Sequence, residues 1–566
     1  MLSYYCKNCK IESNYSECPI CWERTEIKSK LYWCKECNVP MYEEECPICN
    51  KKGKYIGTDI RPVFPEERLL LEILIDEPFK FKNSSVWNVS GNKYIVDGVK
   101  LKYTQKELMK KSPEDVIREL EKYTTTNSYE VFNKYIDKFI KLNTERYNSI
   151  VSEATSYIIE EKEKYGDDQT FVSFSGGKDS TVVSSLVVRA LGTSNIIHIF
   201  GDTTLEFPTT YEYVKRFKNK NIKTPVLAAK NKEKNFYDMC EVIGPPSRVM
   251  RWCCIVFKTG AITKKINTIF KNKDKILTFY GIRRSESLSR SKYERTSDSP
   301  KITKQRVASP ILDWNDFDVW LYLLSSGTDF NDAYRLGYSR VGCWCCPNNT
   351  TWAQYLSKIY MPSQSERWRN ILLDFAKRVG KPDPEVYVDE GKWKARQGGN
   401  GLAAAEDVKI KFTNCTAEEH AKIYKLNKPL TDDFYNLFIP FGKVSRELGR
   451  KLLHEVLVLD MATNVPILSI QPFSQDDYNY AVKIRTLNVA KHEDLQRMVA
   501  YQIRKYNACK RCLKCESVCS FDAISVSNLR YNIDENKCRR CKKCITAKYL
   551  EGGCLMDRFL RSKEEK

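Results

Sequence analysis

The sequence has no apolar run long enough to cross a membrane. Its longest candidates, Leu69 to Ile75 and Thr181 to Leu191, fall far short of the ~20 residues that a transmembrane helix needs. The first residues, Met1 to Cys6, contain neither the basic nor the apolar segment of a secretory signal. These absences predict a cytoplasmic protein with no membrane partner, in which structural disulfides are not expected.

Positive charge and cysteine are both abundant. A chain of 566 residues is too long for one hydrophobic core and predicts about three to four domains. The net charge of +21 and the pI of about 9.0 favour polyanionic partners such as nucleotides, tRNA or DNA. The alternative is an evenly lysine-rich solvated surface, as in thermophiles. The 23 cysteines cluster in C-x-x-C pairs, which indicates bound metal.

Eight cysteines form an internal repeat at the N-terminus. Each copy reads C-x2-C-x8-C-x2-C, and the second begins 28 residues after the first. Four thiolates on two short knuckles suit one tetrahedral Zn2+, which would supply the folding energy that so short a segment lacks. The predicted zinc ligands are Cys6, Cys9, Cys18, Cys21, Cys34, Cys37, Cys46 and Cys49. Pairing across the copies is an open alternative, and the ribbons could serve as a folding staple or as a nucleic-acid clamp.

A glycine-rich loop lies between a short apolar strand, 170–174, and a buried helix, 181–190. Glycines let the backbone approach an anion, and the helix dipole adds partial positive charge. The predicted nucleotide-binding loop consists of Ser175, Gly176, Gly177, Lys178, Asp179 and Ser180. Lys178 adds a full positive charge, and Asp179 would orient the loop or hold Mg2+.

The next strand, 196–200, leads to Asp202. Ligands of a doubly wound sheet lie beyond the carboxyl ends of its strands, so Asp202 and the loop can face one pocket. His198 lies inside this strand and is expected to be a packed core residue rather than a base.

The loop is not a Walker motif, which needs four residues between its glycines. It resembles the PP-loop of the ATP pyrophosphatase and phosphoadenosine-phosphosulfate (PAPS) reductase superfamily. Motifs similar to those of the reductase family follow in order: D-T-T-L-E-F-P from Asp202, R-W-C-C from Arg251, G-I-R from Gly281, P-I-L-D-W from Pro310 and G-C-W-C-C-P from Gly342.

The resemblance covers about 170 to 350 and implies an α/β fold with a doubly wound parallel sheet, like the adenine nucleotide alpha-hydrolases. It implies catalytic roles for Lys178, Asp179, Asp202 and Arg283. Arg283, Arg284 and Arg290 would suit phosphate or sulfate oxygens through their fork geometry, although an ordinary solvated basic turn is the alternative.

Four cysteines in this stretch match a cluster-binding motif. In the adenosine-phosphosulfate-type members, the paired cysteines and the C-x-x-C hold a 4Fe-4S cluster beside the substrate. By resemblance, the ligands here are Cys253, Cys254, Cys343 and Cys346. Cys345 could substitute for a neighbour, and a zinc site is the alternative, because thiolates bind both.

The C-terminal cysteines have ferredoxin spacing. Cysteines 509, 512, 515 and 519 read C-x2-C-x2-C-x3-C, and 538, 541 and 544 begin a second run. In two-cluster ferredoxins the fourth cysteine of each run ligates the other cluster. One 4Fe-4S cluster would therefore use Cys509, Cys512, Cys515 and Cys554, and the other Cys538, Cys541, Cys544 and Cys519.

These patterns predict six regions. They are zinc ribbons at 1–57, a small α+β region at 58–126, a helical connector at 127–165, the PP-loop catalytic domain at 166–380, an α/β linker region at 381–505 and a ferredoxin-type α+β domain at 506–560. Three 4Fe-4S clusters, one or two Zn2+ and an adenine nucleotide are the expected cofactors and substrate.

Three functions compete. The first is reductive sulfur chemistry on an adenylyl sulfate, with electrons from a low-potential donor entering through the ferredoxin-type clusters. The second is ATP-dependent sulfur insertion into tRNA or DNA. An intact PP-loop, the zinc repeats and the net charge of +21 favour it, whereas the family resemblance and the electron module favour the first. The C-terminal E-C-G-x-H cysteine motif of assimilatory reductases is not found, and electrons delivered through the clusters would take the place of its thiol. The third is a non-catalytic electron carrier with a regulatory loop.

Overall fold

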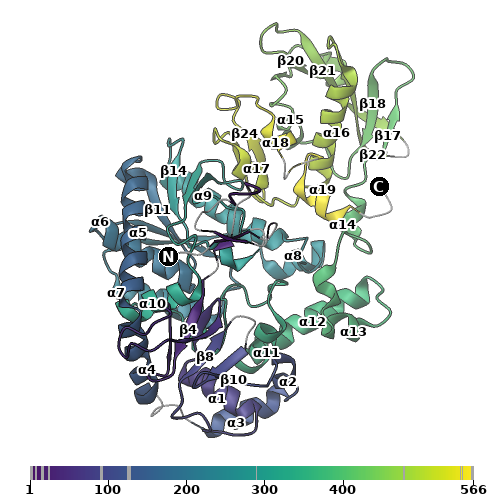
Figure 1. Cartoon of the computed structure of the whole chain (residues 1–566). Coiled ribbons are helices and arrows are strands. Elements are labelled where there is room, and N and C mark those ends of the chain that lie inside the picture. Colours follow the sequence, from purple (N-terminus) through teal and green to yellow (C-terminus); the bar gives the residue numbers. More distant parts are fainter. Residues whose placement is uncertain are drawn as a thin grey trace.

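The fold was analysed in a computed structural model of the chain (Figure 1). The structure describes residues 4–6, 9, 11–13, 18–22, 26–27, 29–89, 93–123, 129–287, 290–475, 478–547, 550 and 552–561. No helix of this described part is both long enough and apolar enough to cross a membrane.

A six-stranded sheet forms the centre of the chain, in the order β13-β12-β11-β14-β16-β15. Its strands are β11 (Thr170–Phe174), β12 (Ile197–Asp202), β13 (Val226–Lys230), β14 (Ile276–Phe279), β15 (Thr296–Asp298) and β16 (Gln305–Ala308). All neighbours pair in parallel except β15, which runs antiparallel to β16. The chain order reverses at β11, which confirms the predicted doubly wound α/β fold and places the switch point between β11 and β14.

Helices cover both faces of this sheet (Figure 1). The helices are α5 (Thr144–Glu163), α6 (Lys178–Leu191), α7 (Pro208–Lys220), α9 (Gly260–Ile269) and α10 (Asp316–Ser326). Helices α5, α6 and α10 bury apolar side chains against Val172 of β11, and α9 packs on the opposite face against Phe171. Because successive strand residues point to opposite faces, one apolar strand serves both layers.

His198 is fully buried in β12, as predicted for a core residue. Its Nε2 lies 2.8 Å from the hydroxyl of Ser184 and its Nδ1 lies 2.8 Å from the carbonyl oxygen of Ile196. Burial lowers the pKa of His198 to about 4 from its ordinary value of 6.5. The imidazole therefore stays neutral in the folded protein.

This shift makes stability depend on pH. Below pH ~6.5, His198 binds a proton in the unfolded chain but stays neutral in the folded protein. The free energy of unfolding therefore falls as the pH drops from about 6.5 towards 4. The loss should reach roughly 3 kcal/mol. Denaturant unfolding between pH 7 and 4.5 would measure it. A His198→Gln variant should lose this part of the slope, and an unchanged slope would contradict the assignment.

The N-terminal repeat folds as two similar three-stranded units. The first contains β1 (Tyr4–Cys6), β2 (Ile11–Ser13) and β3 (Glu26–Ile27), and the second β4 (Leu31–Cys34), β5 (Val39–Met41) and β6 (Lys54–Gly57). The strand orders, β2-β1-β3 and β5-β4-β6, correspond to each other. The symmetry of the cysteine repeat is therefore matched by symmetry of the fold.

The predicted α+β region and connector pack on the catalytic domain. They contain β7 (Ile60–Pro62), α1 (Pro65–Leu74), β8 (Val86–Val89), β9 (Lys93–Val96), β10 (Val99–Lys100), α2 (Gln105–Leu108), α3 (Pro113–Lys122) and α4 (Tyr129–Leu142). The predicted connector is two helices, α4 and α5, which meet at Asn143. The Asn143 side chain accepts a hydrogen bond from the backbone N–H of Tyr42 (2.8 Å) and donates to the carbonyl of Pro40 (3.2 Å), so it fixes the second zinc-type unit to the connector.

Helices α8 (Phe236–Ile243), α11 (Thr351–Tyr360) and α12 (Pro362–Arg378) belong to the predicted catalytic domain. The region predicted as an α/β linker begins with α13 (Pro384–Asp389) and α14 (Ala403–Glu406). After them comes a fully antiparallel sheet in the order β17-β18-β22-β21-β20-β19. Its strands are β17 (Phe412–Asn414), β18 (Ala421–Lys425), β19 (Lys443–Ser445), β20 (Val456–Leu459), β21 (Pro466–Gln475) and β22 (Tyr478–Thr486).

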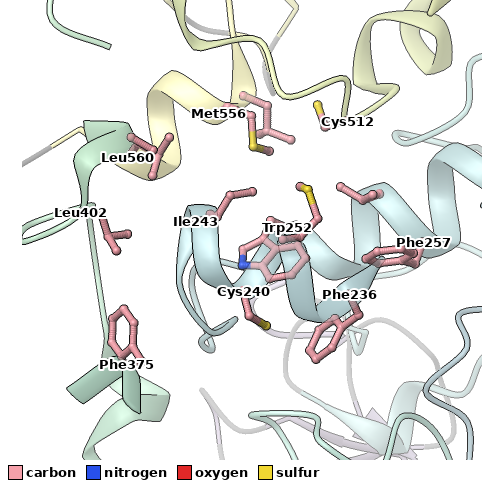
Figure 2. Packing of buried hydrophobic residues seen from close by; sticks show 14 of the residues in the cluster. Phe236, Cys240, Ile243, Trp252, Phe257, Phe375, Leu402, Cys512, Met556 and Leu560 are labelled. Carbon is pink, nitrogen blue, oxygen red and sulfur yellow. The ribbon is translucent and has the colours of Figure 1, made fainter. Parts of the chain in front are cut away.

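The last segment connects this sheet to the catalytic domain. It contains α16 (His492–Ala508), α17 (Lys514–Val518), β23 (Ile524–Val526), β24 (Tyr531–Ile533), α18 (Lys543–Thr546) and α19 (Leu555–Leu560). In Figure 2, Cys512, Met556 and Leu560 lie over Trp252 and Ile243. These residues belong to one apolar cluster that runs from Leu205 to Leu560.

Candidate active site

The glycine-rich loop connects β11 to α6 and is held by hydrogen bonds from within and from a distant segment. Gly176 has φ +71°, a left-handed conformation that favours glycine. The Ser180 hydroxyl donates to the carbonyl of Gly177 (2.9 Å) and accepts from the backbone N–H of Ser175 (3.1 Å). Asn331 donates to the carbonyl of Gly176 (3.2 Å). The loop is therefore rigid before any ligand binds, which suits close backbone contact with an anion.

Two buried cations lie behind the loop. Lys178 and Arg283 are 3% and 4% exposed. The Nε of Arg283 lies 2.6 Å from Asp179 Oδ1 and its Nη2 lies 2.7 Å from Asp316 Oδ1. The Nζ of Lys178 lies 3.3 Å from Asp316 and 3.7 Å from Asp179. The predicted catalytic residues Lys178, Asp179 and Arg283 are thus brought together, but as a network of ion pairs.

The electrostatics of this network explain its charge state. Burial disfavours the Asp316 carboxylate, but Lys178 and Arg283 hold its pKa at about 2. Burial alone would lower the pKa of Arg283, but the carboxylates of Asp179 and Asp316 raise it. Asp59, from the N-terminal region, accepts the backbone N–H groups of Asp316 (3.1 Å) and Phe317 (2.9 Å). Burial, followed by the charge of Asp316, raises the pKa of Asp59 to about 7.

Gly281 follows β14 and touches the loop directly. A Cβ at this position would lie 2.6 Å from the carbonyl carbon of Asp179 and 2.8 Å from the backbone nitrogen of Ser180. Both neighbours are backbone atoms and cannot rotate away. The loop and the segment after β14 therefore fit together only when residue 281 is glycine.

A Gly281→Ala variant should consequently displace the loop. We expect nucleotide affinity to fall by about tenfold or more, since positioning depends on shifts of less than 1 Å. Isothermal titration with an adenine nucleotide would measure the change. Gly342→Ala is the matched control, because a Cβ at Gly342 meets nothing within 4 Å. Equal affinity of the two variants would contradict the assigned contact.

Asp202 lies at the end of β12, as predicted. Its Oδ1 accepts hydrogen bonds from the backbone N–H of Thr204 (2.9 Å) and the hydroxyl of Tyr211 (2.9 Å). The following segment runs beside the cysteine loop, because Glu206 and Cys343 form a β-bridge and the N–H of Trp344 donates to the carbonyl of Leu205 (2.9 Å). One short segment thus runs from Asp202, at the end of β12, to the loop that carries the cysteines.

The two remaining predicted arginines differ in their surroundings. Arg284 pairs with Asp313 and donates to the carbonyl of Tyr293 (3.0 Å). Arg290 pairs with Glu286 and lies within electrostatic reach of Asp179 and Arg340. Burial, followed by the charge of Arg340, lowers the pKa of Arg290. Of the two, Arg290 is the one whose surroundings include the loop.

Five cysteines gather beside the segment that follows Asp202. Cys253 and Cys254 precede and begin a π-helical turn (Cys254–Thr259), and cysteines 343, 345 and 346 lie in the loop before α11. Cys254 accepts a hydrogen bond from Arg251 (3.4 Å) and lies within electrostatic reach of Cys343 and Cys346. The cations around Cys254 are Arg251, Lys258 and Lys301. The sequence motif included Arg251, whereas sequence reasoning missed Lys258 and Lys301.

The C-terminal cysteines lie close to one another. Cys554 lies within electrostatic reach of cysteines 509, 512 and 515. Cys519 lies near Cys541, and Cys544 near cysteines 515, 519 and 538. Sequence reasoning missed Lys505, which is 1% exposed and donates to the carbonyl of Cys544 (2.7 Å).

The zinc-type cysteines gather within each copy. Cysteines 34, 37, 46 and 49 have their sulfur atoms within 4.8 Å of one another, and so do cysteines 9, 18 and 21. The side chain of Cys6 lies outside the described residues. A tetrahedral Zn2+ with bonds of about 2.3 Å requires sulfur separations of roughly 4 Å. The Cys34–Cys49 and Cys37–Cys46 separations are 3.5 and 3.8 Å, so the second copy fits the ion.

Replacing Cys46 with serine should remove one zinc per chain and lower the unfolding temperature. Cys46 is fully buried, and the loss of its thiolate would leave three ligands for a soft ion. Metal analysis and thermal unfolding would measure both effects. Cys415→Ser is the control, because Cys415 belongs to neither group. Unchanged zinc content in Cys46→Ser would contradict the site.

The comparisons with known proteins agree with this geometry. Residues 169–349 match the sequence model of the phosphoadenosine phosphosulfate reductase domain, which confirms the predicted resemblance over the catalytic part. The chain is 31% identical over 279 residues to uncharacterized protein MJ0066 of Methanocaldococcus jannaschii, covering 49% of this chain and 56% of that protein. A second protein of that organism, MJ0973, is 31% identical, with 46% and 60% covered.

More distant matches carry reductase names. The adenosine 5'-phosphosulfate reductase of Anoxybacillus flavithermus is 27% identical over 188 residues, covering 32% of this chain and 74% of that enzyme. A solved phosphoadenylyl-sulfate reductase from Candida auris is 14% identical with a TM-score of 0.28, covering 36% of this chain and 96% of that one. The chain spans little more than half the length of the two M. jannaschii relatives.

Proposed function

From the phosphoadenosine phosphosulfate reductase domain at residues 169–349, we propose that this chain is an iron–sulfur enzyme that reduces an adenylyl sulfate or a related adenylated substrate. The observation that carries the proposal is how the loop and the cysteines are connected. The segment from Asp202 to Glu206 begins at the end of β12, beside the strand that leads into the loop, and pairs with Cys343 of the cysteine loop.

The spacing of the sulfur atoms differs between the N-terminal cysteines and the other cysteine sets, and we relate this difference to two kinds of metal group, Zn2+ and 4Fe-4S. Within the described residues, the cysteines at 253–254 and 343–346 and those of the C-terminal segment do not form groups of three or more with all sulfurs within 4.8 Å. A 4Fe-4S cluster binds each thiolate to a different iron and so holds its ligands further apart than one Zn2+ does. Cysteines 253, 254, 343 and 346 would hold one cluster, and the crossed C-terminal sets two more.

The surroundings of the five cysteines suit an anion. Arg251, Lys258 and Lys301 lie around Cys254, and Arg290 extends the positive charge towards Asp179. Arginine forks and lysine would bind the sulfate oxygens, while the backbone of the loop would bind the phosphate. Tyr334 accepts the N–H of Lys178 (3.0 Å) and so fixes the first turn of α6.

The reaction needs two electrons, which the bound clusters would supply. The sulfur is reduced from S(VI) to S(IV), its bond to the phosphate oxygen breaks, and the products are sulfite and an adenosine phosphate. No proton is required for charge balance between the fully ionised species. The residues of this chain bind and orient the two anionic groups and exclude water from the sulfur.

A second candidate is ATP-dependent sulfur insertion into tRNA or DNA. The complete loop, with Ser175, Lys178, Asp179 and Ser180 all present, favours it, because ATP cleavage needs intact phosphate contacts. In that reaction ATP would adenylate the acceptor and release pyrophosphate.

One set of assays separates the two. Anaerobically prepared full-length protein would receive adenylyl sulfates with reduced viologen, then ATP with and without RNA. Sulfite release supports the proposal. RNA-stimulated pyrophosphate release without sulfite overturns it in favour of the second candidate. Neither activity, with normal reduction of the clusters, would mean an electron carrier.

A further inference from the structure

A basic groove lies in the C-terminal part of the chain, and none of its lining residues belongs to the candidate active site described above. It has a volume of about 740 Å3 and is lined by residues of β17, β18 and α16, which Figure 1 shows close together, and by Arg561, which follows α19. Glu493 is the one carboxylate among the groove's described lining residues. The cations that line it are Lys409, Lys411, Lys422, Arg497, Arg504 and Arg561.

Half of these cations are already neutralised. Lys409 pairs with Glu406 (2.8 Å), Arg497 with Asp494 (2.8 Å) and Arg561 with Asp557. The other three are Lys411, Lys422 and Arg504, which form no ion pair with a carboxylate in the described part of the chain. Uncompensated positive charge gathered in a concave surface focuses an attractive field on an anion.

An aromatic ring stands at the rim of the groove. Phe412 on β17 is 48% exposed, although phenylalanine is a residue that folding usually buries. The ring of Tyr424, itself 2% exposed, supports it at a centroid distance of 5.8 Å, and Lys422 Nζ lies 4.9 Å from its centroid. Phe412 is therefore held in place with part of its surface open to the solvent.

We propose that this groove binds single-stranded nucleic acid. The unpaired cations come from three elements and so can follow a chain of phosphates, and the ring of Phe412 offers a stacking surface to an unpaired base. A base inside a duplex has no free face for such a ring. An acidic peptide would use the cations but not the ring. The site lies outside the proposed reduction and does not depend on it.

Fluorescence anisotropy with labelled oligouridylate and oligothymidylate on the holoprotein tests this site. The double variant Lys411→Glu/Lys422→Glu should weaken binding by about tenfold or more and flatten the salt dependence. Lys215→Glu/Lys218→Glu on α7 is the control of equal charge, because both lysines are exposed outside the groove, and it should retain most of the affinity.

A neutral variant tests the ring without disturbing charge. Phe412→Leu should weaken binding by about fivefold or more while leaving the salt dependence unchanged. Because Phe412 is half-exposed, this variant should fold normally, and it stays informative if the double variant does not fold. Binding of RNA alone, of DNA alone or of both supports the site.

Three results would overturn the proposal. They are equal weakening by the α7 control, full affinity in Phe412→Leu, and equal competition by polyglutamate, which would indicate a general anion surface. Sulfite release should be unchanged in the groove variants. If the proposed reduction is wrong, the wild-type protein releases no sulfite, and the binding results still stand by themselves.

Discussion

Replacing Arg283 with methionine is expected to destabilise the protein by roughly 3–5 kcal/mol and to abolish nucleotide binding. Arg283 is 4% exposed and pairs with both Asp179 and Asp316. Without it, two carboxylates would share the single charge of Lys178 in a buried site. Denaturant unfolding and nucleotide titration would measure the two effects.

The stability difference between Arg283→Met and the wild type should depend on pH. In the wild type the pKa of Asp316 is lowered to about 2, so its stabilising effect is present above pH ~4 and is lost as the pH falls towards 2. In Arg283→Met the carboxylates should hold protons more tightly than in the unfolded chain, so the variant should gain stability as the pH is lowered. The deficit against wild type should therefore shrink between pH 7 and 4.

Arg284→Met is the matched control. Arg284 is adjacent and of the same residue type, but its side chain is 30% exposed and it pairs with Asp313 at the surface. Its loss should cost less than about 1 kcal/mol. If both variants lost the same stability, or if the deficit of Arg283→Met were independent of pH, the buried network would not have the role assigned to it.

Replacing Cys254 with serine should remove about four iron atoms of about twelve per chain and abolish sulfite release. Cys254 lies within reach of Cys343 and Cys346 and accepts a hydrogen bond from Arg251. The C-terminal cysteine sets are untouched, so their clusters should still be reduced by dithionite. Iron analysis and electron paramagnetic resonance would separate the two populations.

The loop of three cysteines supplies the control. Cys345 is 4% exposed and lies in the apolar cluster, within reach of Cys343, Cys240 and Cys346, whereas Cys346 lies within reach of the cation Arg251 and of Cys254. We therefore expect Cys346→Ser to behave like Cys254→Ser and Cys345→Ser to keep its iron. If Cys345→Ser lost iron and Cys346→Ser kept it, Cys345 would be the ligand in place of Cys346. Iron retained in Cys254→Ser would refute the site.

The sequence predicted the features that local patterns encode. The glycine loop, its flanking strand and helix and the position of Asp202 follow from residues that are adjacent in the chain. The loop could not reveal its distant partners. Asp316 and Tyr334 reach Lys178 of the loop from another segment, and Asp59 holds the backbone of Asp316. Before folding, these are ordinary polar residues near helix starts or in loops.

The same reason explains why the strand order of the region before the C-terminal cysteines could not be predicted. Strands β17 and β19 are only three residues long, too short for an alternating pattern to stand out from a loop. Their pairing with β18 and β20 makes them strands. The zinc spacing, in contrast, is local, and its described cysteines lie together within each copy. The ferredoxin-type ligand sets stay a prediction.

The apolar cluster of Figure 2 limits how this protein can be divided. Gly260 of α9 packs so closely on Leu513 that an added Cβ would lie 2.8 Å from the Cβ of Leu513, and Gly399 meets the carbonyl of Leu560 in the same way. A fragment cut from the chain at 166–380 would expose Trp252 and Ile243 to water and would tend to aggregate. Assays of the proposed reduction should therefore use the full chain, and a transplant of the C-terminal cysteine-rich segment into another protein would need to include its partner helix α9.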